Sequence, residues 1–103
     1  MAEDEIILFQ RPENINQVLF VWGLPEQPLS WEEKWRQLEE AFKIYGLLYA
    51  VHVPENTCYA FIKYYSPKSA KKALVNTDRK LFIGKSLLKV YCWNIILLKI
   101  LVK

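Results

Sequence analysis

Aromatic side chains recur at every second position in two short segments of this 103-residue chain. Phe20 and Trp22 lie in the first segment, and Tyr59 and Phe61 lie in the second. Residues spaced by two point to the same face of a β-strand. Exposed rings gathered on one sheet face usually mark a binding surface, and nucleic-acid bases stack on such rings at about 1–3 kcal/mol per base. The spacing therefore predicts a ring platform for bases.

Basic side chains are predicted beside these rings. Lys63 follows the second ring pair by two residues, and a later segment places Lys89 and Tyr91 on the same face. Arg79 and Lys80 precede that segment and are expected at the rim of the face. These cations would hold phosphates, so binding is expected to weaken as salt rises.

Charge is distributed unevenly along the chain. Residues 1–57 hold ten acidic and four basic side chains, a net of −6, whereas residues 58–103 hold one acidic and ten basic ones, a net of +9. A strongly basic half indicates a polyanion or an acidic protein surface as partner. A fold that interleaves the two halves would cancel the asymmetry, so composition alone leaves both interpretations open.

No enzymatic activity is predicted. Catalysis would need a nucleophile with a base, paired carboxylates or a metal set, and the one histidine, His52, with scattered acids supplies none of these. Cys58 and Cys92 lack zinc-site spacing and are expected near opposite ends of the sheet, without a disulfide. No apolar run of about 18 residues and no basic N-terminal leader occur. We expect a reduced intracellular domain with no cofactor, metal, membrane contact or small-molecule substrate.

The elements that must position the rings follow a regular order. A strand is predicted over residues 17–22, and a helix from Trp31 to Tyr45 begins at the N-cap Ser30 and ends before Gly46. Strands are predicted over 47–53 and 58–64, a second helix begins at Pro67, and a last strand covers 87–92. The order β-α-β-β-α-β predicts an α+β, ferredoxin-like split-βαβ sandwich: a four-stranded antiparallel sheet with two helices on one face.

Two terminal segments fall outside this order. Residues 1–16 are predicted to be a flexible leader, and residues 17–92 form the domain. Residues 93–103 are an apolar tail that either adds an element over the sheet or is foreign to the domain, and we favour the second interpretation. The tail is the main obstacle to base binding on the predicted ring platform, because it could lie across the rings.

Two segments carry a resemblance to a known family. Residues 19–24 (LFVWGL) resemble the hexamer motif of the RNA-recognition motif (RRM) family, and residues 57–64 (TCYAFIKY) resemble its octamer, K/R-G-F/Y-G/A-F-V-x-F/Y. The resemblance covers 17–92 and implies a stacking platform of Phe20, Tyr59 and Phe61. Thr57 stands where the octamer has a cation, Cys58 replaces its glycine, and Gly23 replaces the usual asparagine of the hexamer. Phosphate contacts must therefore come from other lysines, with lower affinity than a full-consensus RRM.

Residues 42–51 (FKIYGLLYAV), 61–66 and 78–82 resemble the N-terminal RRM of a vertebrate group of DNA-repair-associated factors. This implies binding of single-stranded DNA or RNA and of damaged double-stranded DNA. It also implies a link to the DNA-damage response and a location in nucleus, nucleolus and cytoplasm. The group's second motif is absent, and 93–103 stands in its place, as expected for a shortened splice isoform.

A protein-binding RRM is the alternative. In that interpretation the acidic helix from Trp31 to Tyr45 docks a partner protein and the sheet face is occluded. Trp31 and Trp35 lie on the apolar stripe of this helix, so we expect them in the core and not at an interface.

Overall fold

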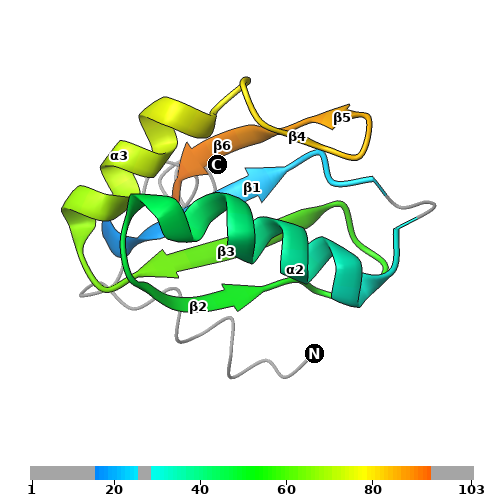
Figure 1. The fold of residues 1–103 in the computed structure, drawn as a ribbon, viewed down its shortest axis with the longest axis horizontal. Helices are drawn as coiled ribbons and strands as arrows, with labels where there is room; N and C mark the ends of the chain where they lie inside the picture. The colour runs from blue at the N-terminus through cyan, green and yellow to red at the C-terminus, as the bar shows by residue number, and fades with distance from the viewer. Residues whose placement is uncertain (1–15, 26–28, 94–103) are drawn as a thin grey trace, which may run out of the picture.

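The computed structural model of the protein describes residues 16–25 and 29–93. Four strands form an antiparallel sheet in the order β2-β3-β1-β6, and α2 and α3 cover one face of it (Figure 1). Strands β4 and β5 form a separate hairpin. This is the predicted ferredoxin-like arrangement, with β1 and β3 at the centre. In chain order the elements are β1 (Val18–Trp22), α2 (Trp31–Phe42), η2 (Lys43–Tyr45), β2 (Leu48–His52), β3 (Tyr59–Tyr64), α3 (Pro67–Thr77), β4 (Phe82–Ile83), β5 (Ser86–Leu87) and β6 (Lys89–Cys92).

Two element ends differ from the prediction. The first helix becomes the 3₁₀ turn η2 after Phe42, where the Tyr64 hydroxyl donates a hydrogen bond of 2.6 Å to the Phe42 carbonyl and satisfies it. The last strand begins two residues later than expected, at Lys89, because the residues before it pair in the β4–β5 hairpin. The predicted caps are confirmed, since the hydroxyls of Ser30 and Ser66 accept from backbone amides in the first turns of α2 and α3.

The hydrophobic core lies between the sheet and the two helices. Strand β3 directs Ala60, Ile62 and Tyr64 into this core, and β1 directs Leu19 and Val21 into it, as the period of two predicts. All five side chains are almost fully buried. The residues between them therefore point to the opposite face of the sheet, which neither α2 nor α3 covers (Figure 1).

The indoles of α2 cap the edge strand β2. Trp35 donates from Nε1 to the Val51 carbonyl at 3.1 Å, and Trp31 donates in the same way to the Val53 carbonyl. These bonds occupy carbonyls that an edge strand would otherwise present to a neighbouring chain. The expectation that both indoles are core residues is wrong for Trp31, which is exposed, whereas Trp35 packs partly buried against the core.

Among the described residues, no helix is long and apolar enough to cross a membrane. The same part of the chain contains no group of three His, Cys, Asp or Glu side chains able to hold a metal ion. Cys58 and Cys92 are both free thiols.

Candidate nucleic-acid interface

The register of the central strands brings the predicted rings together on the face opposite the helices. Strand β1 pairs with β3 so that Phe20 lies opposite Phe61 and Trp22 lies opposite Tyr59. On its other side, β1 pairs with β6 so that Phe20 lies opposite Tyr91. One aromatic cluster therefore spans three adjacent strands, and we call its five residues the ring platform.

Phe20 lies at the centre of the ring platform. Its ring centroid is 5.5 Å from that of Phe61, 5.6 Å from Tyr59 and 6.4 Å from Tyr91. Trp22 and Tyr59 lie 6.4 Å apart with their planes only 9° from parallel. These separations are those of favourable aromatic pairs, so the rings hold one another in place.

The rings differ in how much surface they offer. Trp22 is exposed, and Phe20, Tyr59 and Tyr91 are half-buried. Phe61 is only 4% exposed, so its direction is as predicted but its expected exposure is wrong. His52 on β2 stacks against Phe61, with the ring centroids 6.2 Å apart and an interplanar angle of 18°.

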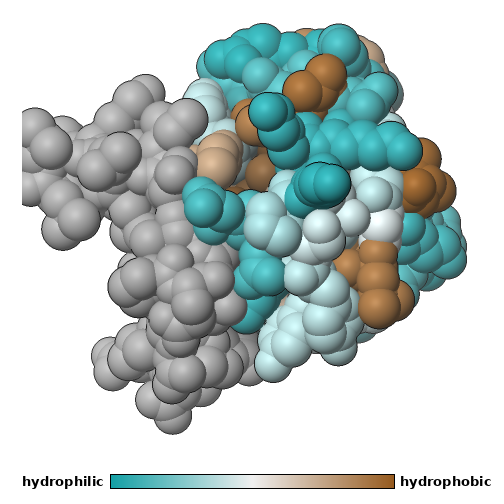
Figure 2. Space-filling model, turned by 90° about the vertical axis from the view of Figure 1, so that its left-hand side faces the viewer, coloured by the Kyte–Doolittle hydropathy of each residue, from teal (hydrophilic) through white to brown (hydrophobic). Residues whose placement is uncertain are grey.

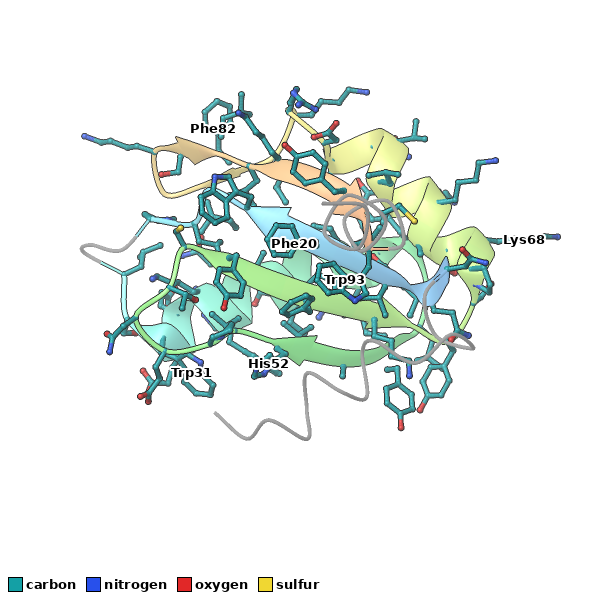
Figure 3. All side chains as sticks on the ribbon, turned by 180° about the vertical axis from the view of Figure 1, so that it is seen from behind. Phe20, Trp31, His52, Lys68, Phe82 and Trp93 are labelled. Atoms are coloured by element: carbon teal, nitrogen blue, oxygen red, sulfur yellow. The ribbon has the colours of Figure 1, made fainter. Side chains whose placement is uncertain are left out.

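Trp93 covers part of the ring platform, which explains much of the burial of Phe61. The Trp93 ring lies 5.6 Å from Phe20 at an interplanar angle of 29°, and it meets Phe61 edge-on at 4.9 Å. Figure 3 shows Trp93 beside Phe20 on the sheet face away from the helices. Trp93 is the first residue of the predicted tail, whose other residues lie outside the described part of the chain.

The Trp93 indole N–H is buried where the ring packs on the platform. Its side chain is 5% exposed, and its Nε1–H finds no acceptor among the described residues. A buried donor without a partner costs about 1–3 kcal/mol. Apolar packing therefore stabilises the contact of Trp93 with the platform, whereas the burial of the indole N–H destabilises it.

The predicted cations occupy three different environments. Lys63 is only 8% exposed, which corrects the expectation of an open phosphate contact, and its Nζ lies 4.3 Å above the Tyr49 ring. Lys89 is exposed and pairs with Trp22 across β6 and β1. Arg79 and Lys80 are exposed on the loop after α3.

The two loop cations also bond to their own segment. Arg79 forms an ion pair of 2.6 Å with Asp78, and the Lys80 ammonium donates to the Val75 carbonyl at 3.0 Å. Lys89, by contrast, lies directly opposite an exposed platform ring, Trp22, in the sheet.

The sequence profile of the RNA recognition motif family matches residues 19–88. The chain belongs to this family. RRM domains are nucleic-acid-binding modules that stack bases on aromatic side chains of the hexamer and octamer motifs. In this RRM those positions are Phe20 on β1 and Tyr59 and Phe61 on β3, which are three of the five platform residues.

Curated relatives are named RAD52 motif-containing protein 1. The Homo sapiens and Macaca fascicularis proteins are each 37% identical over 92 residues, which cover 84% of this chain and 32% of the relative. The Danio rerio protein is 33% identical over 95 residues, covering 85% of this chain and 33% of the relative. This RRM is therefore related to these proteins and spans about a third of their length.

Solved RRM structures share the fold. The RRM of Nab3 recognises cis elements of non-polyadenylated RNAs. It superposes on this chain with a TM-score of 0.59 at 21% sequence identity. That match covers 75% of this chain and 93% of the other. The third RRM of Pes4 gives a TM-score of 0.60 at 18% identity, covering 74% and 89% of the two chains.

Two features of the site escape prediction from the sequence. Trp93 falls in the predicted tail, although its spacing of two residues from Tyr91 is a signal for a further ring on that face. Tyr49 and Tyr65 form a second aromatic pair at 5.2 Å. A register shift lies between Leu48 and Ala50, so the strict alternation of side chains along a strand does not predict where the Tyr49 ring points.

The acidic face of α2 is partly neutralised within the helix. Arg36 pairs with Glu40 at 3.0 Å and also with Glu33, and Lys43 lies 3.9 Å from Glu39. The hydrogen bond from Arg36 lowers the pKa of Glu33 below its usual value. This helix therefore presents less unpaired negative charge than its sequence suggests.

Proposed function

We propose that this RRM binds single-stranded DNA or RNA on the ring platform, with bases stacked on Phe20, Tyr59 and Phe61 and with Trp22 and Tyr91 beside them. The observation that carries the proposal is the contact of four other aromatic rings with Phe20 on the sheet face that the helices leave uncovered. Base–ring stacking contributes about 1–3 kcal/mol per base and tolerates different sequences.

A bound base and Trp93 compete for the same rings. The Trp93 ring lies 4.9 Å from Phe61, and Phe61 is 4% exposed, so no base fits on Phe61 while the indole is in place. The indole and a base are both flat aromatic rings, and the face of a base can take over the stacking contacts that Trp93 gives up. Full use of the platform therefore requires Trp93 to move, and the apparent affinity is reduced by the stability of the Trp93 contact.

Phosphates are held by Lys89 beside Trp22 and by Arg79 and Lys80 at the rim. Each phosphate contact on a single strand makes the slope of log K against log salt more negative by about 0.7. Because Thr57 stands where the octamer motif has a cation, these three side chains replace that contact. Lys63 contributes positive charge next to Phe61, although its ammonium lies over Tyr49.

The relatives' name supports a further part of the proposal. Their RAD52 motif points to DNA metabolism, so we extend the ligands to damaged or distorted double-stranded DNA and the role to DNA repair or the DNA-damage response. We propose with this role a location in the nucleus, including the nucleolus, and in the cytoplasm.

The test is a fluorescence-anisotropy titration of single-stranded DNA and RNA with the full chain. We expect Tyr59→Ala combined with Phe61→Ala to weaken binding at least tenfold, because two stacking positions are lost. Because Phe61 is buried, Trp22→Ala combined with Tyr59→Ala is the second variant, which leaves the buried ring intact. Phe82→Ala, which removes an exposed ring outside the platform, is the matched control. Equal affinities of wild type and both double variants would overturn the proposal.

The burial of Phe61 and Trp93 favours the protein-binding alternative as a second candidate. In that case the sheet face stays closed and a partner protein docks on α2, where the Trp31 indole is exposed. Trp31→Ala would then abolish partner binding, and opening the platform would create no affinity for oligonucleotides.

A further inference from the structure

We propose that Tyr49 and Tyr65 form a second nucleic-acid subsite, which takes a base and its phosphate where the strand leaves the ring platform. This inference rests on the proposed function, because it extends the path of the same strand. It adds a binding position on β2 and on the residue after β3, outside the hexamer and octamer motifs.

The first observation is the geometry of the two tyrosines. Tyr49 is 56% exposed and Tyr65 is 57% exposed, yet their rings meet at 5.2 Å in an edge-to-face arrangement. The backbone of Tyr65 is fixed on both sides, since its N–H donates to the Leu47 carbonyl and its carbonyl accepts from Gln17 Nε2 at 2.8 Å. One ring from β2 and one from the residue after β3 are thus held in place while large parts of both face solvent.

The second observation is the backbone irregularity that positions Tyr49. Leu48 pairs with Tyr64 and Ala50 pairs with Lys63, so two steps along β2 correspond to one step along β3. Tyr49 is the extra residue of a β-bulge, a feature that re-aims a side chain and is enriched next to binding sites. Here it places the Tyr49 ring 4.3 Å from the Lys63 ammonium.

The third observation is that the pair continues the ring platform. Lys63 follows Phe61 by two residues on the same face of β3, a distance of about 7 Å. Two stacked nucleotide steps cover a similar distance. His52 and Ala50 line β2 beside this path, with His52 stacked on Phe61. A strand that runs from Phe20 across Phe61 therefore reaches the Tyr49–Tyr65 pair without leaving the sheet.

The surrounding charge favours a polyanion as the occupant. Lys63 lies over the Tyr49 ring, and Lys68 is exposed in the first turn of α3, three residues after Tyr65. Figure 2 views the end of the molecule where β3 ends and α3 begins, and in its coloured part hydrophobic side chains form small groups among hydrophilic ones. Protein-docking patches are typically larger and continuous. In this proposal the rings take a base, the exposed Lys68 takes its phosphate, and the buried Lys63 adds positive charge without a direct contact.

The experiment measures affinity against oligonucleotide length. Oligo-dT and oligo-U of four, six, eight and ten nucleotides are titrated against the full chain. The wild type is expected to gain affinity as the strand becomes long enough to reach Tyr49 and Tyr65. In Tyr49→Ala combined with Tyr65→Ala this gain is expected to be lost. The variant should then bind the long strands about five- to one-hundredfold more weakly than the wild type, because one base stack is removed. Affinity for the four-nucleotide strand should stay unchanged.

Two matched variants isolate the stacking role. Tyr49→Phe combined with Tyr65→Phe keeps both rings and should retain the gain with length. Phe82→Ala removes an equally exposed ring on the separate β4–β5 hairpin, on the side of the molecule away from His52 (Figure 3), and should leave the whole length series unchanged. Circular dichroism and thermal unfolding verify that each variant keeps the fold, as expected for exposed positions.

The outcomes separate this inference from the proposed function. If the double Ala variant keeps the full gain with length, the subsite is overturned while the platform stands. If the wild type binds no strand of any length, both proposals are overturned. A variant that loses self-association while its oligonucleotide affinities stay unchanged would assign the pair to protein contact and overturn the subsite.

Discussion

At the scale of single residues, Trp93 determines how much of the ring platform is available. Its indole packs on Phe20 and Phe61, and its Nε1–H is buried without an acceptor among the described residues. In the proposed function nucleic acid and Trp93 use the same platform surface, so we expect that a weaker Trp93 contact strengthens binding.

We therefore expect Trp93→Ala to raise affinity for single strands and to lower stability. The variant removes the competitor, while the loss of buried area, offset by removal of the unsatisfied N–H, costs about 1–4 kcal/mol of unfolding free energy. Trp93→Phe keeps a ring over the platform and is expected to bind close to wild type. Anisotropy titrations and urea unfolding measure both quantities. Unchanged affinity in Trp93→Ala would contradict the competition.

The buried Tyr64 phenol is expected to make the free energy of unfolding depend on pH in the alkaline range. Its side chain is fully buried and donates to the Phe42 carbonyl. Burial, assisted by the neighbouring Tyr45, raises the pKa of the Tyr64 phenol well above its ordinary value. A raised pKa in the folded state means that the neutral form stabilises the fold, so this contribution is complete below pH about 10 and is lost as pH rises further.

Tyr64→Phe is expected to cost about 1–2 kcal/mol at neutral pH, because the Phe42 carbonyl loses its donor. Above pH about 10 the wild type should lose stability more steeply than the variant, which has no phenol to ionise at this position. Urea unfolding of both proteins between pH 8 and 11 measures the difference. Parallel curves over this range would show that Tyr64 does not carry the effect.

At the scale of elements, the connection between η2 and β2 is built on Gly46. Its φ is +155°, and a Cβ placed there would lie 2.5 Å from the Cβ of Ser69 in α3. The close approach of this turn to α3 helps to fix β2, the strand that carries Tyr49 and His52. A side chain at position 46 would force the two segments apart.

Gly46→Ala is therefore expected to destabilise the fold by about 1–3 kcal/mol through overpacking. Gly84→Ala is the control, because it also has a positive φ, of +62°, but its Cβ would meet no atom closer than 3.6 Å. That variant should cost only about 1 kcal/mol of backbone strain. Thermal unfolding compares the two, and equal costs would argue against the contact with Ser69.

Much of the fold at this scale is predictable from the sequence. The alternation in β1 and β3 is local, so the inward Leu19 and Val21 and the outward Phe20 follow from the period of two. The bulge at Tyr49 breaks that period and depends on how β2 pairs with β3. The burial of Phe61 and Lys63 depends on contacts across the fold, which no spacing rule contains. Side-chain direction was thus predictable, whereas exposure was not.

At the scale of the whole molecule, the basic half of the chain does not act as one surface. Lys89 lies opposite Trp22 of the ring platform, and Arg79 and Lys80, which we propose for its rim, are exposed on the loop after α3. Lys72, by contrast, is exposed on α3, which covers the other sheet face. Exposed charges separated by more than about 10 Å are largely screened at 0.1 M salt. Only the first group is therefore expected to contribute to the salt dependence of binding through contact.

Lys89→Gln is expected to lower the magnitude of the slope of log K against log salt by about 0.7, because one phosphate contact is lost. Lys72→Gln removes the same charge from α3 and should leave the slope close to wild type. Titrations between 50 and 300 mM salt give both slopes. If the two variants changed the slope equally, the phosphate path would not pass Lys89.

The most direct test of the central claim is an NMR titration of the isotope-labelled full chain with an unlabelled single-stranded oligonucleotide. We expect shift changes concentrated on β1, β3 and β6 around Phe20, Tyr59 and Phe61. We also expect the Trp93 indole N–H signal to move toward a solvent-exposed position as the base displaces the indole. Changes confined to α2, with the ring platform and the Trp93 indole unaffected, would contradict it.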